Sequence, residues 1–264
     1  MSQLHIIKIG GNIVDEESSL SAFLQQFASL KGVKVLVHGG GKIATRIGEQ
    51  LGITSQYVEG RRITDEPTLD LVTMVYGGLL NKKIVAALQS LGCNALGVTG
   101  ADANLIPADK RPVSTIDFGF VGDVKASAIP VQSWMQLLNS GFIPVVAPLT
   151  HDGKGRLLNT NADTLAQEIA KALSSHYQVS LVYSFEKSGV LTDVNDEHSV
   201  IDKLDPSKYQ QLKKEQKIFA GMIPKLDNAF TALEKGVQKV IIGNALQLDQ
   251  LINGAAGTTI AHES

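Results

Sequence analysis

The first stretch of the chain, residues 5–12 with the sequence HIIKIGGN, places a lysine inside a short apolar run that ends in two glycines. Such a run is typical of a parallel strand that is covered on both faces. Lys8 is costly there unless an anion meets its charge, and Gly10 and Gly11 let a ligand approach the backbone N–H groups closely. The stretch therefore predicts a phosphate site at a strand end; the alternative is a lysine that extends to water.

The same pattern then follows a second time. Residues 16–30 carry apolar side chains at helical spacing, and residues 33–37 form another apolar run. Residues 38–41 read HGGG, and residues 42–51 again have helical spacing. This order predicts a βαβ unit with a right-handed crossover and a parallel sheet. Both glycine loops should then lie at the carboxyl edge of the sheet, where such sheets bind ligands.

The rest of the chain continues the alternation without an internal repeat or an obvious linker. In chain order we expect a loop or hairpin over 55–64, a helix over 67–91 capped by Thr64, a strand over 95–98, a hairpin over 117–123, a helix over 131–138, a strand over 142–147, a helix opened by 159–163, a strand over 178–185, a helix over 222–235, a strand over 237–242 and an edge strand over 258–261. The sequence therefore predicts one α/β domain over residues 1–264, with two functional halves that meet near residue 155.

Composition narrows the class of function. The 264 residues are 44% hydrophobic and 19% charged, and the net charge of −2 gives no reason to expect a nucleic-acid or anionic-membrane partner. The single cysteine, Cys93, excludes an internal disulfide and suits a reducing compartment. Neither a signal-peptide pattern nor an apolar run of transmembrane length is present in the sequence, so we expect a cytoplasmic protein.

The HGGG loop is an anion or carboxylate cradle, because it joins a strand to a helix N-terminus with unpaired N–H groups. It lacks the spacing of a Walker-type loop and of the Gly-x-Gly-x-x-Gly dinucleotide fingerprint. No acidic residue closes the second strand either, which disfavours a dinucleotide fold further. On its own the loop is weak evidence, since glycine-rich turns of this kind serve many ligands.

Three polar residues two positions apart, Asn159, Asn161 and Asp163, stand at a predicted helix start. One of them would suffice as an N-cap, so the surplus favours a site. Lys225 lies in the first turn of another predicted helix, where a cation is unfavourable unless it shares an anion with the helix N-terminus; a solvated lysine is the alternative. Lys8, Lys225 and Asp163 together suit phosphoryl transfer, in which catalysis is mainly positioning and electrostatic stabilisation. The histidines show no metal-ligand spacing, and no catalytic triad can be defended.

Five motifs in this order resemble the amino acid kinase family, most closely its acetylglutamate kinase branch. They are residues 8–11 (KIGG), 38–41 (HGGG), 60–64 (GRRIT), 159–163 (NTNAD) and 221–225 (GMIPK). The resemblance covers nearly the whole chain. It implies a three-layer αβα sandwich with a mainly parallel central sheet. It also implies ATP-dependent phosphorylation of the γ-carboxylate of an N-acylated glutamate, giving an acyl phosphate in arginine biosynthesis.

The resemblance also implies residue roles. Lys8 and Lys225 would stabilise the transferring phosphoryl group, Asp163 would orient both lysines, and Mg²⁺ would arrive with ATP. Residues 1–155 would mainly bind the acceptor and residues 156–264 mainly ATP. Gly10 and Gly11 would donate to the phosphates, and Gly40 and Gly41 would receive the γ-carboxylate. Arg62 and Asn159 would hold the α-carboxylate and acyl-amide end of the acceptor. The adenine side would involve Lys187, Ser188, Gly189, Val190 and Leu191.

The sequence departs from the family pattern at Glu186–Lys187, at Ala220 and at Lys42, which leaves details of nucleotide and acceptor contact open. N-acetylglutamate is the expected acceptor. N-succinylglutamate stays open because a second carboxylate would need a further cation, and Lys42, Arg61 and Lys82 are unassigned. Aspartate, glutamate, carbamate and uridylate kinases and a non-catalytic ligand sensor are the rival interpretations.

Assembly is a further expectation. The apolar residues of the helix over 67–91, which include Val72, Val75, Leu79, Leu80 and Ile84, exceed one face and predict a homodimer interface. Arginine-sensitive members of the branch carry a helix before the first strand, and here that strand begins after about five residues. We therefore expect little inhibition by arginine.

Overall fold

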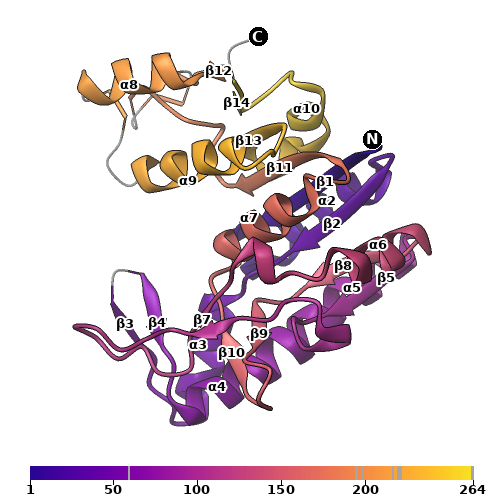
Figure 1. The fold of residues 1–264 in the computed structure, drawn as a ribbon, viewed down its shortest axis with the longest axis vertical. Coiled ribbons are helices and arrows are strands. Elements are labelled where there is room, and N and C mark those ends of the chain that lie inside the picture. The colour runs from indigo at the N-terminus through magenta and orange to yellow at the C-terminus, as the bar shows by residue number, and fades with distance from the viewer. Residues whose placement is uncertain (59, 194–195, 198, 216, 219–221, 263–264) are drawn as a thin grey trace.

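The computed structural model describes residues 1–264 except 59, 194–195, 198, 216, 219–221 and 263–264. Its centre is an eight-stranded sheet with the strand order β12-β14-β13-β11-β1-β2-β8-β5 (Figure 1). The strands are β1 (Gln3–Ile9), β2 (Val33–Val37), β5 (Ala95–Val98), β8 (Ile143–Val146), β11 (Gln178–Phe185), β12 (Lys203–Leu204), β13 (Lys239–Asn244) and β14 (Thr258–Ile260). All strands that the sequence predicted for this sheet are present.

The sheet is parallel from β13 through to β5, as expected. β14 pairs antiparallel with β13, and β12 pairs parallel with β14, so these two strands run opposite to the rest. The prediction that residues 258–261 form the edge was wrong, because β12 covers that side. A strand of only two residues leaves no periodic signal in a sequence, which is why β12 was not foreseen.

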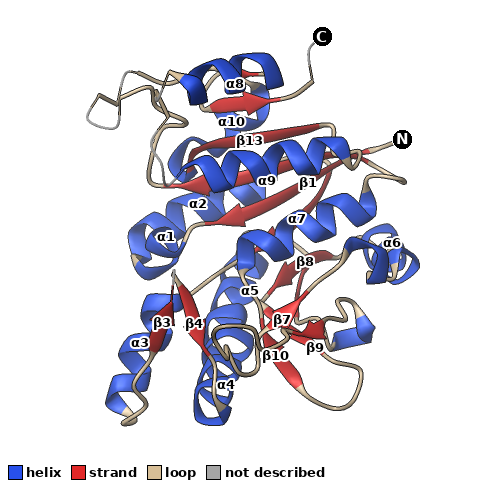
Figure 2. Cartoon of the chain, turned by 60° about the vertical axis from the view of Figure 1, so that its left-hand side comes forward, coloured by secondary structure: helices blue, strands red, loops and turns tan. Residues whose placement is uncertain are grey.

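Helices cover both faces of the sheet, which confirms the three-layer αβα sandwich (Figure 2). One layer comprises α1 (Gly11–Asp15), α2 (Glu17–Ser29), α3 (Gly41–Gln50), α4 (Glu66–Val72), α5 (Asn81–Ser90) and α10 (Leu248–Asn253). The other comprises α6 (Val131–Asn139), α7 (Ala162–Leu173), α8 (Pro206–Lys214) and α9 (Ile223–Glu234). Each layer packs on the sheet through its own cluster of buried apolar side chains, so the sheet is covered as its apolar strands require.

The pleat of β1 decides where Lys8 points. Leu4 and Ile6 belong to the core on the α7 side, whereas Ile7 and Ile9 belong to the core on the α2 side. Side chains alternate across a strand, so Lys8 shares its face with Ile6 and lies toward α7. This is the face from which Asp163 approaches.

Three small hairpins lie beside the main sheet. They pair β3 (Gln56–Val58) with β4 (Arg61–Ile63), β6 (Asp109–Lys110) with β7 (Gly122–Asp123), and β9 (Leu149–His151) with β10 (Leu157–Asn159). The first confirms the hairpin within residues 55–64. The hairpin predicted within residues 117–123 was wrong, since β7 pairs with a strand further back. The intervening segment instead bonds to Thr64, whose carbonyl accepts from Phe120 N at 2.7 Å.

The helix predicted over 67–91 is continuous from Glu66 to Ser90, but its middle, Thr73–Leu80, is π-helical. The side chain of Asp65 caps it by accepting from Thr68 N at 3.0 Å, so the cap assigned to Thr64 was wrong. By length and composition this helix meets the criteria for a membrane span, with a mean hydropathy of 1.3. Buried helices of globular cores meet the same criteria, and Leu71 and Val72 are fully buried here.

Candidate functional site

The site lies at the carboxyl edge of the sheet, beside its central strand. β1 lies between β11 and β2, and the chain proceeds from β1 to one side of the sheet before it returns to the other. A reversal of strand order of this kind opens a crevice beyond the strand ends. The carboxyl ends of β1 and β11 and the glycine loop after β2 line the pockets in that region, whereas Gly10 and Gly11 after β1 line neither.

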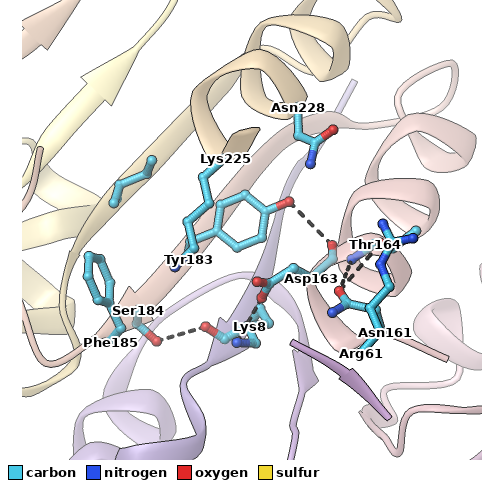
Figure 3. Close-up of a pocket in the computed structure, with 11 residues that line it drawn as sticks. Lys8, Arg61, Asn161, Asp163, Thr164, Tyr183, Ser184, Phe185, Lys225 and Asn228 are labelled. Carbon is cyan, nitrogen blue, oxygen red and sulfur yellow. Dashed lines mark hydrogen bonds and ion pairs between the residues drawn. The ribbon is translucent and has the colours of Figure 1, made fainter. Parts of the chain in front are cut away.

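Lys8 and Asp163 form an ion pair at the bottom of the first pocket, with 2.7 Å between Nζ and Oδ1 (Figure 3). Their side chains are 16% and 35% exposed, so the pair is partly shielded from water. Asn161 is the N-cap of α7 and accepts from Thr164 N at 3.0 Å. The cap interpretation therefore holds for Asn161, whereas Asp163 faces the pocket.

Lys225 reaches the same pocket from α9. Its Nζ lies 5.0 Å from the centre of the Phe185 ring, a cation–π contact. The pocket has a volume of about 160 Å³ and is lined by Lys8, Arg61, Asn161, Asp163, Thr164, Tyr183, Ser184, Phe185, Lys225, Asn228 and Ile242. The structure thus brings the three predicted catalytic residues together, although Asp163 pairs with Lys8 and the contact described for Lys225 is with Phe185. Gly221 of the fifth motif lies outside the described residues, as does Ala220.

Tyr183 closes one wall of this pocket. Its hydroxyl donates to the backbone carbonyl of Asp163 at 3.3 Å. Burial raises the pKa of Tyr183 well above its usual value, and the charge of Asp163 adds to this shift. The phenol therefore stays protonated and acts as a fixed donor that holds the first turn of α7 against β11.

A second pocket of about 200 Å³ adjoins the first and shares Arg61, Asn161 and Thr164 with it. Its lining includes Gly39, Gly40, Gly41, Tyr57, Arg62, Tyr76, Arg111 and Asn159. All four residues predicted to bind the acceptor, Gly40, Gly41, Arg62 and Asn159, therefore lie around one cavity. They come from β2–α3, β4 and β10, which are far apart in the sequence.

Arg62 is only 6% exposed and is held on several sides. Its Nη2 donates to the Gly41 carbonyl at 2.8 Å and to Thr45 Oγ1 at 3.1 Å, and its guanidinium lies 4.8 Å from the Tyr57 ring centre. Nη1 donates to Ser55 Oγ. The arginine is thus fixed in place and ties the β3–β4 hairpin to the start of α3, in addition to lining the pocket.

The loop after β1 departs from expectation at Gly10. The N–H of Gly10 donates to the Ser184 carbonyl at 2.7 Å, so this group is already bonded and is not free for a phosphate. β1 pairs with β11 up to Ile9, which lies opposite Ser184, and the Gly10 N–H adds one more hydrogen bond between the two strands. Gly11 begins α1, where the first N–H groups of a helix have no intrahelical partner. Gly11 is therefore the better donor of the two.

The segment predicted for the adenine side, Lys187–Leu191, lines neither pocket. Val190 is fully buried, and its N–H donates to Thr258 Oγ1 at 2.8 Å. Lys187 Nζ lies 3.5 Å from Glu197 Oε1. The segment packs against β14, and its contact with a nucleotide stays a prediction.

Sequence reasoning gave no role to several pocket residues. Arg111 was not considered, because it stands in a turn-rich stretch without a motif. Tyr76 lies in the apolar stretch of the long helix, and it lines the second pocket beside Gly40. Arg61, named only as an unassigned cation, lines both pockets. Its position next to Arg62 on a short hairpin was the signal in the sequence that could have pointed to it.

Within the described part of the chain, no cluster of three or more His, Cys, Asp or Glu side chains could hold a metal ion. The carboxylate nearest the first pocket, Asp163, is paired with Lys8. The chemistry that these residues offer is cationic and hydrogen-bonding: lysines and arginines around two joined cavities, with a glycine loop at the far end.

The profile of the amino acid kinase family matches residues 3–244. An acetylglutamate kinase from Cytophaga hutchinsonii is 58% identical over 254 residues, which are 96% of this chain and 96% of that protein. An acetylglutamate kinase from Parabacteroides distasonis is 54% identical, over 95% of this chain and 97% of that protein. The likeness therefore extends over nearly the full length of both relatives.

Among solved structures, an N-acetylglutamate synthase from Neisseria gonorrhoeae complexed with coenzyme A and L-arginine superposes with a TM-score of 0.78 at 21% identity. The superposition covers 99% of this chain, and the chain spans 62% of that one, so the likeness concerns the fold of a part of it. The resemblance suggested by the five motifs is thus confirmed over nearly the entire sequence, and the chain belongs to the amino acid kinase family.

Proposed function

We propose that the protein transfers the γ-phosphoryl group of ATP to the γ-carboxylate of an N-acylated L-glutamate, with N-acetyl-L-glutamate as the leading acceptor. The observation that carries the proposal is the pair of adjoining pockets. One holds Lys8, Asp163 and Lys225, the other is lined by Gly40, Gly41, Arg62 and Asn159, and Arg61 borders both. Relatives named acetylglutamate kinase at 54–58% identity support this choice of acceptor.

In the proposed reaction, a carboxylate oxygen of the acceptor attacks the γ-phosphorus. The bond to the β,γ-bridging oxygen breaks, ADP leaves with the bonding electrons, and an acyl phosphate forms. Negative charge builds on the equatorial and leaving oxygens, and the ammonium groups of Lys8 and Lys225 lie at the pocket where this charge develops. Asp163 holds Lys8 in position. The glycine loop at α3 receives the attacking carboxylate, and Arg62 is available to its other carboxylate.

The family implies Mg²⁺ with the nucleotide. Since the described residues offer no carboxylate cluster for it, the ion would be held by the ATP phosphates. The larger assignments of the two halves, residues 1–155 to the acceptor and 156–264 to ATP, are part of the proposal, as are a place in arginine biosynthesis and a cytoplasmic location. The lone cysteine, which is buried, is consistent with a reducing compartment.

A coupled assay of ADP release tests the function. The purified protein is given ATP with N-acetylglutamate, N-succinylglutamate, glutamate or aspartate in turn. We expect turnover with an N-acylated glutamate and little with the free amino acids. Turnover on aspartate or free glutamate alone would assign a different acceptor, and ATP binding without turnover on any of them would favour a ligand sensor on the same fold.

N-succinyl-L-glutamate is the second candidate acceptor, and Arg111 is the observation that favours it. The Arg111 guanidinium is held by Asp123, with Nε 3.0 Å from Oδ1, and lies 5.3 Å from the centre of the Phe118 ring. It lines the second pocket together with Arg61 and Arg62. Lys82 instead donates to the Gly97 carbonyl, and Lys42 to Asn12 Oδ1, and neither lines this pocket.

Comparing kcat/KM for the two acyl glutamates decides between them. A tenfold ratio corresponds to about 1.4 kcal/mol of discrimination. If the succinyl carboxylate is bound by Arg111, Arg111→Ala lowers kcat/KM for N-succinylglutamate and leaves that for N-acetylglutamate nearly unchanged. Equal losses of kcat/KM on both acceptors would show that Arg111 does not distinguish the succinyl from the acetyl group.

A further inference from the structure

His38 is a fully buried residue at the end of β2 for which the proposed mechanism has no use. Its ring is fixed at both nitrogens. Nδ1 lies 2.9 Å from the carbonyl oxygen of Gly39, the next residue, and Nε2 lies 3.2 Å from the side-chain amide nitrogen of Asn81. Asn81 is itself only 1% exposed and opens α5 on the long helix.

The orientation of the Asn81 amide determines which ring nitrogen of His38 carries the proton. The same Asn81 Nδ2 donates to the Val145 carbonyl at 2.8 Å, and Asn81 Oδ1 accepts from Lys82 Nζ at 3.2 Å. The amide nitrogen is thus the atom that faces His38, and an amide nitrogen only donates. Nε2 must therefore accept, so the proton is on Nδ1, from which it is donated to the Gly39 carbonyl.

The ring is neutral as well as fixed. Burial lowers the pKa of His38 from 6.5 to about 4, although its hydrogen bond with Gly39 acts in the opposite direction. Near neutral pH a single tautomer, with the proton on Nδ1, is therefore the state that satisfies all four hydrogen bonds described for the pair.

The bond to Gly39 constrains the next peptide group. The described chain has no cis peptide bond, so the C=O of Gly39 and the N–H of Gly40 point in opposite directions across their shared plane. The carbonyl points to His38, hence the N–H points away from it. Gly40 lines the second pocket at the start of α3. Given the proposed function, we infer that His38 and Asn81 are positioning residues that aim the Gly40 N–H at the acceptor carboxylate.

The π-helical segment Thr73–Leu80 supports the same loop. A Cβ atom on Gly40 would lie 2.1 Å from Leu80 Cδ1 and 3.4 Å from the Tyr76 ring, so the loop rests directly on this part of the helix. In a π-helix the backbone hydrogen bonds join residues five apart, so residues at this spacing lie one turn apart on the same side of the helix. The wider turn thus lets Tyr76 and Asn81 act on neighbouring parts of the loop.

The test combines nitrogen NMR with acceptor kinetics. In the wild-type protein labelled with ¹⁵N-histidine, His38 should give the shifts of a neutral ring protonated on Nδ1. Asn81→Ala removes the donor to Nε2, so the other tautomer should appear in the spectrum. The KM for N-acetylglutamate should then rise about tenfold, as expected for one lost hydrogen bond, with the KM for ATP nearly unchanged.

Two further variants sharpen the test. Asn81→Asp favours a doubly protonated ring that still donates from Nδ1, so its acceptor KM should lie closer to the wild-type value than that of Asn81→Ala. Asn94→Ala, at an exposed asparagine that donates to Gly141, is the matched control and should change neither KM.

Two results would overturn the inference. One is a wild-type His38 protonated on Nε2, which needs no variant to detect. The other is Asn81→Ala with an altered tautomer and an unchanged acceptor KM. Failure of the proposed function looks different, because the wild-type protein would then release no ADP with any acyl glutamate while the tautomer measurement stands.

Discussion

At the scale of single residues, the candidate site is defined by an imbalance of charge. Lys8, Arg61 and Lys225 line the first pocket together with one carboxylate, Asp163, which is already paired with Lys8. A pocket with surplus positive charge attracts an anion of high charge density, such as a triphosphate. The second pocket adds Arg62 and Arg111 but also the neutral donors of the glycine loop.

Lys8→Ala and Lys225→Ala should each lower kcat by about 10²–10³, with much smaller effects on substrate binding. Each charge meets density that develops mainly in the transition state, so its loss is felt in turnover. Steady-state kinetics with ATP and the acceptor give both parameters. Lys154→Ala, at an exposed turn, is the control. A variant with unchanged turnover would remove that lysine from the mechanism.

The pH dependence of stability should reflect His38. Its folded pKa of about 4 lies below the unfolded value of 6.5, so the unfolded chain binds more protons between these limits. Stability is therefore full above pH 6.5 and falls by roughly 3 kcal/mol as the pH approaches 4. Burial also lowers the pKa of His5, which acts in the same direction. Urea unfolding of wild type and His38→Gln at a series of pH values measures the difference; parallel curves would contradict it.

At the scale of elements, the loop after β2 depends on the long helix beneath it. Gly40 has φ +149° and no room for a side chain, whereas the Cβ of a residue at Gly41 would find its nearest neighbour, Arg62 Nη2, at 4.0 Å. The two adjacent glycines therefore have different structural roles. The first permits close contact with Leu80, and the second leaves space at the entrance of α3.

Gly40→Ala should consequently be far more damaging than Gly41→Ala. The added methyl of Gly40→Ala meets Leu80 and a backbone conformation that side chains rarely adopt, so the loop must move. We expect a loss of thermal stability and a large rise in acceptor KM for Gly40→Ala, and a much smaller change in melting temperature for Gly41→Ala. Equal melting temperatures for the two variants would show that the loop adjusts without cost.

Lys34 makes a second contact between elements, from β2 to the end of α2, whose contribution to stability should be measurable. This buried residue of β2 donates from Nζ to the carbonyls of Phe27, Ala28 and Leu30, at 2.7, 3.0 and 2.7 Å, and so satisfies the C-terminal end of α2. Lys34→Met leaves these carbonyls without the donor and should lower the unfolding free energy by about 2–4 kcal/mol.

The matched control is Lys31→Met, at the exposed neighbour. Denaturant unfolding of both variants, with kcat measured on the folded protein, separates stability from function. A loss of turnover in folded Lys34→Met, or equal destabilisation by Lys31→Met, would contradict this account.

At the scale of the whole molecule, the long helix buries most of its apolar residues within this chain, which leaves fewer of them for an interface between two copies. The apolar residues Val72, Val75, Leu79, Leu80 and Ile84 were expected to exceed the face that the helix buries in its own core, but all except Leu79 are buried within this single chain. Val75, Tyr76 and Leu80 of the π-helical middle are all buried, so the chain's own core accounts for most of the apolar breadth. Met74 and Leu79 stay exposed, at 55% and 39%.

A homodimer therefore stays a prediction, now resting on Met74 and Leu79. Light scattering at low micromolar concentration should give twice the monomer mass for the wild-type protein and the monomer mass for Met74→Glu/Leu79→Glu. Val113→Glu, at an exposed apolar residue outside this helix, should stay dimeric. A monomeric wild-type protein would refute the dimer, and a dimer that survives both glutamates would place the interface elsewhere.

Local patterns determined much of this protein. Short apolar runs that end at or shortly before a glycine predicted the strands β1, β2 and β11, because a buried strand is apolar on both faces. Helical spacing likewise located α2 and the long helix. The five motifs pointed to Lys8, Asp163, Lys225, Gly40, Gly41, Arg62 and Asn159, each of which lines one of the two pockets, and also to Gly10 and Gly11, which line neither.

Only the tertiary structure decided what depends on contacts between distant segments. The N–H of Gly10 donates to Ser184 across the sheet, the two-residue strand β12 forms the edge, and Arg111 lines the second pocket. The proton on His38 is likewise set by Asn81, forty-three positions away. Periodicity and composition report which residues are buried, but a hydrogen-bond partner is chosen by packing, and packing exists only once the layers have assembled.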